Sequence, residues 1–226
     1  MDAFNVFSNE PLTEDDILGT WAGLRPLVKS AETERTADLS RRHVVSVSDS
    51  GVVTVTGGKL TTYRKMAADT VDEVVRLLGH GPKRSPTKKL RLRCAEGTED
   101  LRCDDAAGRL EVDADLLAHL VGRYGGEARA VLAMLEADPH LAAPLVPGLP
   151  YLRAEAVYAA RYEMAHTLTD VLARRTRALL LARDAASEAA HAVAKLLAPE
   201  LGWSAAETQR QVDEFCALVA REKAMA

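Results

Sequence analysis

Two hydrophobic patterns follow one another along the chain. In residues 44–47 and 52–56, apolar β-branched residues alternate with polar ones, which is typical of pleated strands with one covered face. The turn signal Asp49-Ser50-Gly51 lies between the two runs, so a β-hairpin is predicted. From residue 60 to about residue 78 the apolar positions recur at helical spacing, and Gly79 supplies a stop.

After about residue 112 the pattern changes to that of alanine-rich helices. The predicted helices cover residues 114–124, 127–137, 153–165 or onward to 176, 184–197, and 204 to about 222. Gly125-Gly126 closes the first, Pro199 and Gly202 end the fourth, and the capping box Ser204-Ala205-Ala206-Glu207 opens the last. Short loops between the helices predict an antiparallel helical bundle.

Less regular stretches separate these elements. Residues 11–16 predict a loop leading into a short helical turn, residues 19–28 begin as a strand and stop at Pro26, and residues 29–43 are a polar loop. The basic stretch 81–89 contains two prolines and predicts a linker, and residues 90–94 predict a short edge strand. The fold class is therefore α+β: a short β-hairpin with a long helix, followed by an all-α C-terminal domain. The predicted divisions are residues 1–82, 83–111 and 112–226.

Composition narrows the function classes. The chain has 226 residues, 47% of them hydrophobic but only 4% aromatic, so its core must be built mainly from Ala, Leu and Val. A net charge of -4 gives no global case for nucleic-acid binding, and Arg174-Arg175-Thr176-Arg177 is short and has no interleaved aromatic residues. We therefore expect no nucleic-acid partner.

The cysteines, the histidines and the lengths of the apolar runs bear on metal binding and on the cellular compartment. The three cysteines lack C-x-x-C spacing, so we expect no disulfide framework or cysteine zinc site and a reducing cytosol. His119, His166 and His191 stand singly on predicted helices, which favours core or surface histidines over metal ligands. No apolar run approaches the roughly 20 residues that span a bilayer, and the start of the chain does not resemble a signal peptide. Peripheral membrane contact stays open.

The main candidate for chemistry is the corner Gly57-Gly58-Lys59 between the predicted strand and helix. Two glycines let the backbone turn sharply, and a helix start offers free N–H groups and a positive dipole end. The alternative is a tight turn that needs glycine for geometry alone. A Walker A loop is excluded, since Val53 stands where its first glycine belongs and Leu60 where Ser or Thr should follow. A G-x-G-x-x-G dinucleotide fingerprint is absent from the sequence.

Arginines upstream of the corner suggest an anionic substrate. Arg25 precedes Pro26, which favours extended geometry, and an arginine among apolar neighbours needs an anionic partner unless it reaches solvent. Arg41 and Arg42 lie at the entrance of the predicted hairpin. Together with Lys59 these arginines suit a phosphate group, because a guanidinium donates bidentately to phosphate oxygens.

These motifs resemble a known family in matching order over nearly the whole chain. Trp21-Ala22-Gly23-Leu24-Arg25-Pro26-Leu27, Ser40-Arg41 and the run from Gly57-Gly58-Lys59 to Ala67 are similar to the FAD-dependent (aerobic) glycerol-3-phosphate dehydrogenases. Residues 163–177 resemble that family's helical C-terminal domain. The family's G-x-G-x-x-G Rossmann segment is missing here. The resemblance thus makes residues 1–82 the remnant of an FAD-binding/substrate domain, in a fragment or truncated reading frame.

The resemblance implies oxidation of glycerol 3-phosphate at C2, with hydride passing to flavin N5, and a quinone or oxygen as the electron acceptor. Arg25 matches the substrate-phosphate arginine, and Arg41 the arginine opening the next strand, with Arg42 the alternative. Lys59 matches the lysine at the flavin edge. The positions where the family's backbone meets FAD are Gly57, Gly58, Leu60, Thr61 and Thr62.

Three hypotheses follow. The first is a C-terminal part of this flavoprotein, cytoplasmic or peripheral at the inner face of the membrane, inactive as an isolated chain. The second is a non-catalytic helical interaction module carried by residues 112–226. The third is another FAD-dependent oxidase of the same superfamily.

Overall fold

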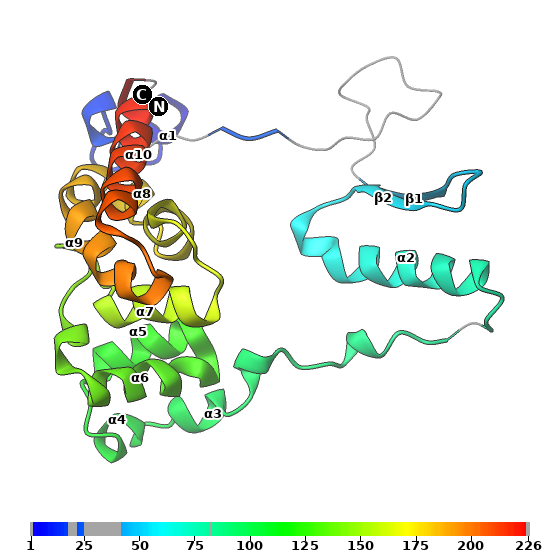
Figure 1. The fold of residues 1–226 in the computed structure, drawn as a ribbon, viewed down its shortest axis with the longest axis horizontal. Helices are drawn as coiled ribbons and strands as arrows, with labels where there is room; N and C mark the ends of the chain where they lie inside the picture. Colours follow the sequence, from blue (N-terminus) through cyan, green and yellow to red (C-terminus); the bar gives the residue numbers. More distant parts are fainter. Residues whose placement is uncertain (1, 18–21, 25–41, 82, 225–226) are drawn as a thin grey trace. The chain divides into compact units, whose positions relative to one another are not determined.

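The structure is a computed structural model that describes residues 2–17, 22–24, 42–81 and 83–224. It divides into two compact units, each described below by itself. The hairpin unit is Ala22–Leu92, and the helical unit comprises Met1–Trp21 and Arg93–Ala226. The sequence predicts an α+β chain with a small sheet and many helices, and the structure confirms this fold class (Figure 1). The three-part division predicted above stays a prediction.

The hairpin unit is built on two antiparallel strands, β1 (His43–Val47) and β2 (Val53–Gly57). Their register pairs His43 with Gly57 and Val47 with Val53. The connecting turn contains Gly51 at φ +82°, and the Ser48 carbonyl accepts from the Gly51 N–H at 2.9 Å. The predicted hairpin is therefore confirmed, one residue longer at the start of the first strand and shifted by one residue at the second.

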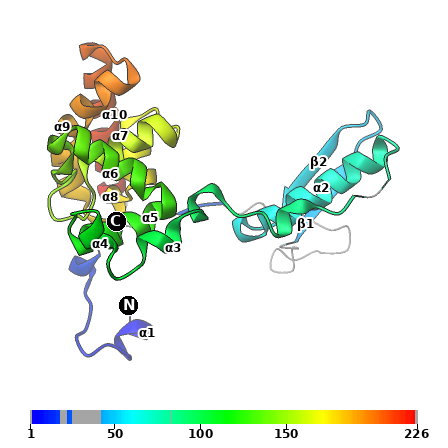
Figure 2. The same ribbon diagram turned by 90° about the horizontal axis from the view of Figure 1, so that it is seen from below.

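Helix α2 (Tyr63–Leu77) packs against both strands of the hairpin (Figure 2). A single 3₁₀ turn, η3 (Leu60–Thr62), precedes it. The helix ends as the sequence predicted, with Gly79 at φ +70° and the His80 N–H donating to the Val75 carbonyl at 3.1 Å.

No described residue of the hairpin unit is buried. Helix α2 shows why, because large apolar side chains on it are exposed, among them Tyr63 and Val71, each at 58% exposure. Together with the segment that follows the helix, these two side chains line an apolar groove of about 560 Å³. The hairpin unit thus has an apolar surface but no core of its own among the described residues.

The predicted edge strand at residues 90–94 is wrong. No strand forms there, and Arg93–Ala95 makes a 3₁₀ turn, η5. Leu90 and Leu92 alternate as in a strand but are 71% and 63% exposed, and no described strand lies beside them to accept a ladder. The short 3₁₀ turn η4 (Pro86–Lys88) lies just before them.

The described part of the helical unit contains eight α-helices after its N-terminal segment, together with 3₁₀ turns and one π-helix. Its N-terminal segment has α1 (Asp2–Asn5) and the predicted short turn, η1 (Glu14–Asp16). The α-helices that follow are α3 (Thr98–Leu101), α4 (Ala106–Arg109), α5 (Ala114–Tyr124), α6 (Ala128–Ala137), α7 (Arg153–Tyr162), α8 (Ala178–Leu181), α9 (Arg183–Leu201) and α10 (Ala205–Ala224). The other turns are η6 (Gly125–Glu127), η7 (Pro139–Ala142) and the π-helix η8 (Asp170–Arg175).

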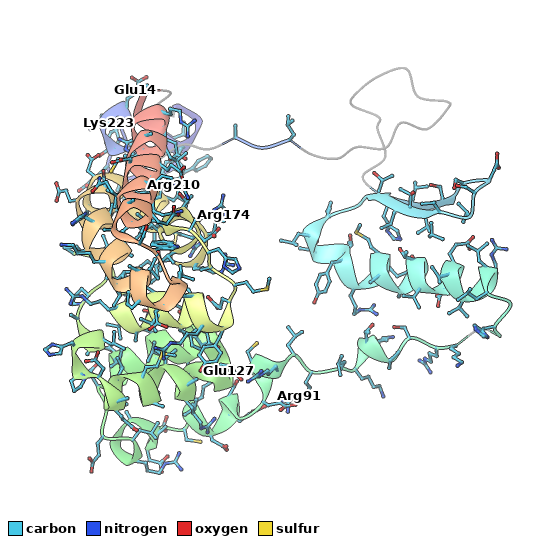
Figure 3. The ribbon with its side chains drawn as sticks, in the orientation of Figure 1. Glu14, Arg91, Glu127, Arg174, Arg210 and Lys223 are labelled. Carbon is cyan, nitrogen blue, oxygen red and sulfur yellow. The ribbon has the colours of Figure 1, made fainter. Side chains whose placement is uncertain are left out.

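Two hydrophobic clusters form the core of this unit, and α7 belongs to both. Its Val157 and Tyr158 pack with α5 and α6, while Ala156 and Ala159 pack with α9 and α10 around Phe215. At the surface, Lys223 of α10 reaches Asp184 of α9 at 3.4 Å (Figure 3).

Two predicted helix ends need correction. The helix from residue 153 ends at Tyr162, because Met164 adopts a left-handed backbone (φ +57°) and Asp170 then caps the His166 and Thr167 N–H groups. Helix α9 continues through Pro199 and ends at Gly202, whose φ is +67°. The glycine, and not the proline, is the stop. In the predicted capping box, the Glu207 N–H donates to Ser204 Oγ at 3.1 Å.

Candidate functional site

The glycine corner, which we define as residues 57–62, joins strand β2 to helix α2. Gly57 and Gly58 have φ of +76° and +77°, the left-handed region that L side chains rarely adopt. A Cβ on Gly58 would also lie 2.6 Å from Met66 Sδ and 3.3 Å from His43 Cβ. The left-handed backbone therefore favours glycine at position 58, and a Cβ there would also displace the side chain of Met66.

The corner opens on the start of a helix. The Lys59 N–H donates to Thr62 Oγ1 at 3.1 Å, and the Thr62 hydroxyl donates back to the Lys59 carbonyl at 2.9 Å. This reciprocal cap leaves the N–H groups of Leu60 and Thr61, the first of the helical run, without intrahelical partners. Leu60 is 89% exposed, and the side chain of Lys59 is exposed as well. An anionic, partly apolar ligand would meet two donors, one cation and an apolar side chain here.

Two residues that sequence reasoning missed, His43 beside the corner and Asp69 on α2, are bonded to each other. His43 Nε2 is 2.8 Å from Asp69 Oδ2, and Lys65 Nζ is 2.5 Å from Asp69 Oδ1. The hydrogen bonds from Lys65 and then from His43 hold the pKa of Asp69 below its usual range. The four-residue spacing of Lys65 and Asp69 on a helix was visible in the sequence, but a contact spanning 26 residues to His43 was not.

The predicted arginines cannot be placed against the corner. Arg25 and Arg41 lie outside the described residues. Arg42 is described and exposed, directly before strand β1, and it has an interaction partner. Of the predicted site residues, the structure therefore brings together Gly57, Gly58, Lys59 and residues 60–62, which are adjacent in sequence.

The residues present in the corner fit an edge of FAD. The left-handed glycines remove any Cβ from the approach to the backbone, and the exposed helix start offers the backbone N–H groups of Leu60 and Thr61. A reduced flavin carries negative charge at its N1–C2=O edge, which such donors and Lys59 would stabilise. The corner therefore suits a flavin edge because it offers N–H donors to an anionic group, and not because it holds a cluster of metal ligands.

The helical unit holds a second polar cluster, centred on Glu155 of α7. The side chain of Glu155 is fully buried, and its Oε2 lies 3.0 Å from His119 Nε2 and accepts from the Leu152 N–H at 2.7 Å. Its Oε1 accepts from the Tyr124 hydroxyl at 3.0 Å and lies 2.9 Å from Arg123 Nε. Burial, together with this carboxylate, raises the pKa of Tyr124 well above its ordinary value. Because both carboxylate oxygens are engaged inside the core, the Glu155 cluster holds helices α5 and α7 together.

Further polar contacts extend from this cluster toward the surface. Arg123 donates from Nη2 to the Arg175 carbonyl, and Arg175 donates from Nη2 to the Glu163 carbonyl at 2.6 Å. Glu127 accepts from Arg93 Nε at 2.9 Å and from the Tyr158 hydroxyl at 3.3 Å (Figure 3). The contacts of Arg123 and Arg175 fix the turn between α7 and the π-helix.

Comparisons with known proteins identify the family. The model of a family described as the C-terminal domain of alpha-glycerophosphate oxidase matches residues 85–208, and the chain belongs to this family. The glycerol-3-phosphate dehydrogenase 2 of Mycobacterium tuberculosis (strain ATCC 25618 / H37Rv) is 40% identical over 220 residues, which cover 96% of this chain and 37% of that protein. The mitochondrial glycerol-3-phosphate dehydrogenase of Rattus norvegicus is 37% identical, covering 88% of this chain and 28% of its own length.

A solved structure agrees with these relatives. The glycerol-3-phosphate dehydrogenase from Bacillus halodurans, complexed with FAD, matches with a TM-score of 0.71 and 30% identity. The match covers 92% of this chain and 40% of that one. The resemblance to glycerol-3-phosphate dehydrogenases predicted from the motifs is thus confirmed, and the chain spans well under half the length of these relatives.

A membrane-spanning helix is not found in the described part of the chain, since none of its helices is both long and apolar enough.

Proposed function

We propose that this chain is part of an FAD-dependent glycerol-3-phosphate dehydrogenase, to which it contributes the flavin-edge corner, the substrate-phosphate arginines and the helical domain. The observation that carries the proposal is the glycine corner: two successive left-handed glycines opening on an exposed, donor-rich helix start. The corner lies in a chain whose relatives are glycerol-3-phosphate dehydrogenases, one of them solved with FAD.

The proposed role of the glycine corner is to stabilise the negative charge of the reduced flavin. FAD, when bound, would accept the hydride from C2 of glycerol 3-phosphate, and loss of the C2 hydroxyl proton to solvent or to a base outside this chain would complete the oxidation to dihydroxyacetone phosphate. Lys59 and the N–H groups of Leu60 and Thr61 would then offset the negative charge of the reduced state, which raises the affinity for reduced over oxidised flavin. Gly57 and Gly58 would allow the backbone to approach the ring without a clash.

The arginines would select the substrate. Arg25 and Arg41, with Arg42 as the alternative to Arg41, would donate to the phosphate oxygens of glycerol 3-phosphate. A phosphate bound in this way holds the substrate in one orientation, so that C2 faces the flavin. This role separates the proposed activity from that of an amine or simple hydroxy-acid oxidase, which has no phosphate to bind.

The finer parts of the proposal concern the electron acceptor and the location. We propose a quinone or molecular oxygen as the acceptor and a cytoplasmic protein in peripheral contact with the inner face of the membrane. The two acceptors are distinguished by reducing the assembled enzyme and following its reoxidation. One sample receives a soluble quinone in the absence of oxygen, and the other receives air alone.

The test is to assemble the site from two parts. The purified chain alone is expected to be colourless, because it has no G-x-G-x-x-G segment to bind the pyrophosphate. Co-expression with the part of the Mycobacterium tuberculosis relative outside the match should give a yellow protein that glycerol 3-phosphate bleaches. Stoichiometric flavin on the isolated chain would contradict the need for that part.

The phosphate role is tested separately in the assembled enzyme. Arg25→Ala should raise the KM for glycerol 3-phosphate at least tenfold, since a charged hydrogen bond contributes about 1.5–3 kcal/mol. Arg84→Ala, in the exposed linker segment, is the matched control and should leave the KM unchanged. An unaltered KM in Arg25→Ala would show that this arginine does not bind the phosphate.

A further inference from the structure

His43 occupies a position that links three parts of the hairpin unit. It is the first residue of β1 and lies opposite Gly57 in the strand register. Its side chain is only 18% exposed, and its Nε2 lies 2.8 Å from Asp69 Oδ2 on helix α2. A carboxylate only accepts hydrogen bonds, so Nε2 carries the proton in this contact.

Asp69 completes the link. Its second oxygen, Oδ1, accepts from Lys65 Nζ one helical turn earlier, so both oxygens have a partner. The carboxylate is held charged, with a pKa below its ordinary value. His43 and Asp69 thereby fasten the start of the hairpin to the second turn of α2 in a unit where no described residue is buried.

The glycine corner is the loop that this contact closes. One end of the corner, Gly57, is paired with His43 across the hairpin, and the other end continues into α2, which carries Asp69. A Cβ on Gly58 would lie 3.3 Å from His43 Cβ, so the histidine also forms part of the floor under the corner. The parts of His43 that meet the corner are its backbone and Cβ, so the imidazole acts on the corner by fixing their position through Asp69.

We propose that His43 and Asp69 are positioning residues for the flavin-facing glycine corner. They do not touch the ligand. They act through Gly57 and Gly58, and so fix the direction in which Lys59 and the N–H groups of Leu60 and Thr61 point. This inference rests on the proposed function, and it adds to it two residues outside the ligand-contacting set.

The geometric half of the inference is tested on the full chain without flavin. In His43→Ala and Asp69→Asn, the ¹⁵N–¹H signals of Gly57, Gly58 and Lys59 should shift, and their amide hydrogen exchange should accelerate at least tenfold. His43→Gln keeps an N–H donor and should restore most of the protection. Glu73→Gln removes another paired carboxylate of α2, bound to Arg76, and should leave the corner signals in place.

Signals from the last turns of helix α2 report whether the hairpin unit of a variant has merely unfolded. If the corner amides are unmoved in His43→Ala while α2 is intact, the positioning role is refuted. The same conclusion holds if Glu73→Gln disturbs the corner as much as Asp69→Asn does.

The functional half uses the assembled flavoprotein. His43→Ala should reduce the preference for reduced over oxidised flavin about tenfold, which corresponds to about 30 mV in a two-electron midpoint potential. The KM for glycerol 3-phosphate should change less than kcat, and His43→Gln should recover most of the potential. A loss of packing alone would lower the amount of folded protein without shifting the potential.

The outcomes separate the two proposals. If no assembly turns yellow, wild type included, the proposed function fails. If the wild type is yellow and His43→Ala keeps its midpoint potential although its corner amides have shifted, the positioning role fails while the proposed function stands.

Discussion

The two units of this chain are stabilised in different ways. Every buried hydrophobic residue of the described structure lies in the helical unit, in two clusters that meet on α7. The hairpin unit has none, and its apolar groove along α2 is open. A two-stranded hairpin is marginal in water without a covered face, so the polar contacts of Asp69 matter more in this unit than comparable contacts do elsewhere.

The difference bears on function. The candidate site lies in the unit without a core, where atoms are held by hydrogen bonds, glycine geometry and one packed helix face. The helical unit holds its polar groups inside the core instead, as the Glu155 cluster shows. A site on the hairpin unit therefore depends on hydrogen bonds and glycine geometry more than on burial.

The largest expected effect comes from removing a core side chain. Phe215 of α10 is fully buried, and Phe215→Ala should destabilise the helical unit by about 3–5 kcal/mol. Val71→Ala, at a 58% exposed position of α2, should change stability by less than about 0.5 kcal/mol. Urea unfolding followed by circular dichroism measures both. A similar loss in the two variants would mean that α2 is covered in solution.

A second large effect is expected from the Glu155 cluster. Glu155→Gln leaves Arg123 without a buried counter-charge and should cost about 3–5 kcal/mol. Glu200→Gln breaks the surface pair with Arg161, at 2.6 Å, and should cost at most about 1 kcal/mol. Thermal unfolding compares the two. Equal shifts in Tm would show that burial does not govern the strength of these pairs.

An intermediate effect is expected where the backbone itself is close-packed. Gly125 has φ +57°, and a Cβ there would lie 2.1 Å from the Cys94 carbonyl oxygen. Gly125→Ala should therefore destabilise by about 1–3 kcal/mol. Gly122 of α5 has no atom within 4 Å of its Cβ position, and Gly122→Ala should stabilise by about 0.5–1 kcal/mol through helix propensity. Opposite signs in chemical denaturation confirm the contrast between the two glycines.

Local signals in the sequence predicted most elements but not the contacts between them. The hairpin, the glycine corner and the helix at residues 114–124 followed from alternation, helical periodicity and glycine, which act over a few residues. The helix end at Tyr162 did not, because Met164 adopts its left-handed backbone within tertiary contacts such as those of Arg175. Leu90 and Leu92 had the alternation of a strand without a neighbour to pair with.

The same limit applies to the sites. Residues 57–62 of the candidate site were identified because they are contiguous, whereas His43–Asp69 and His119–Glu155 join positions 26 and 36 residues apart. His119 was expected to be an isolated core or surface histidine, and only the fold brings Glu155 to it. No propensity or spacing rule reports such pairs in a single sequence.

The smallest expected effect is a change in the pH dependence of stability, which distinguishes a carboxyl group governed by burial from one governed by hydrogen bonds. Burial raises the pKa of Glu163 in the helical unit, although Arg175 opposes the shift. The folded state then binds the proton more tightly, so stability falls as pH rises from the unfolded pKa through the folded one. Glu163→Gln should therefore stabilise at pH 7, by less than about 1 kcal/mol, and the gain should vanish near pH 4.

Asp69 of the hairpin unit should behave in the opposite way. Its hydrogen bonds lower its pKa, so its contribution is present above the unfolded pKa and is lost as pH falls through the folded one. Asp69→Asn should accelerate exchange of the corner amides at pH 7 and converge with wild type in acid. If both variants respond to pH with the same sign, hydrogen bonding does not replace burial in the hairpin unit.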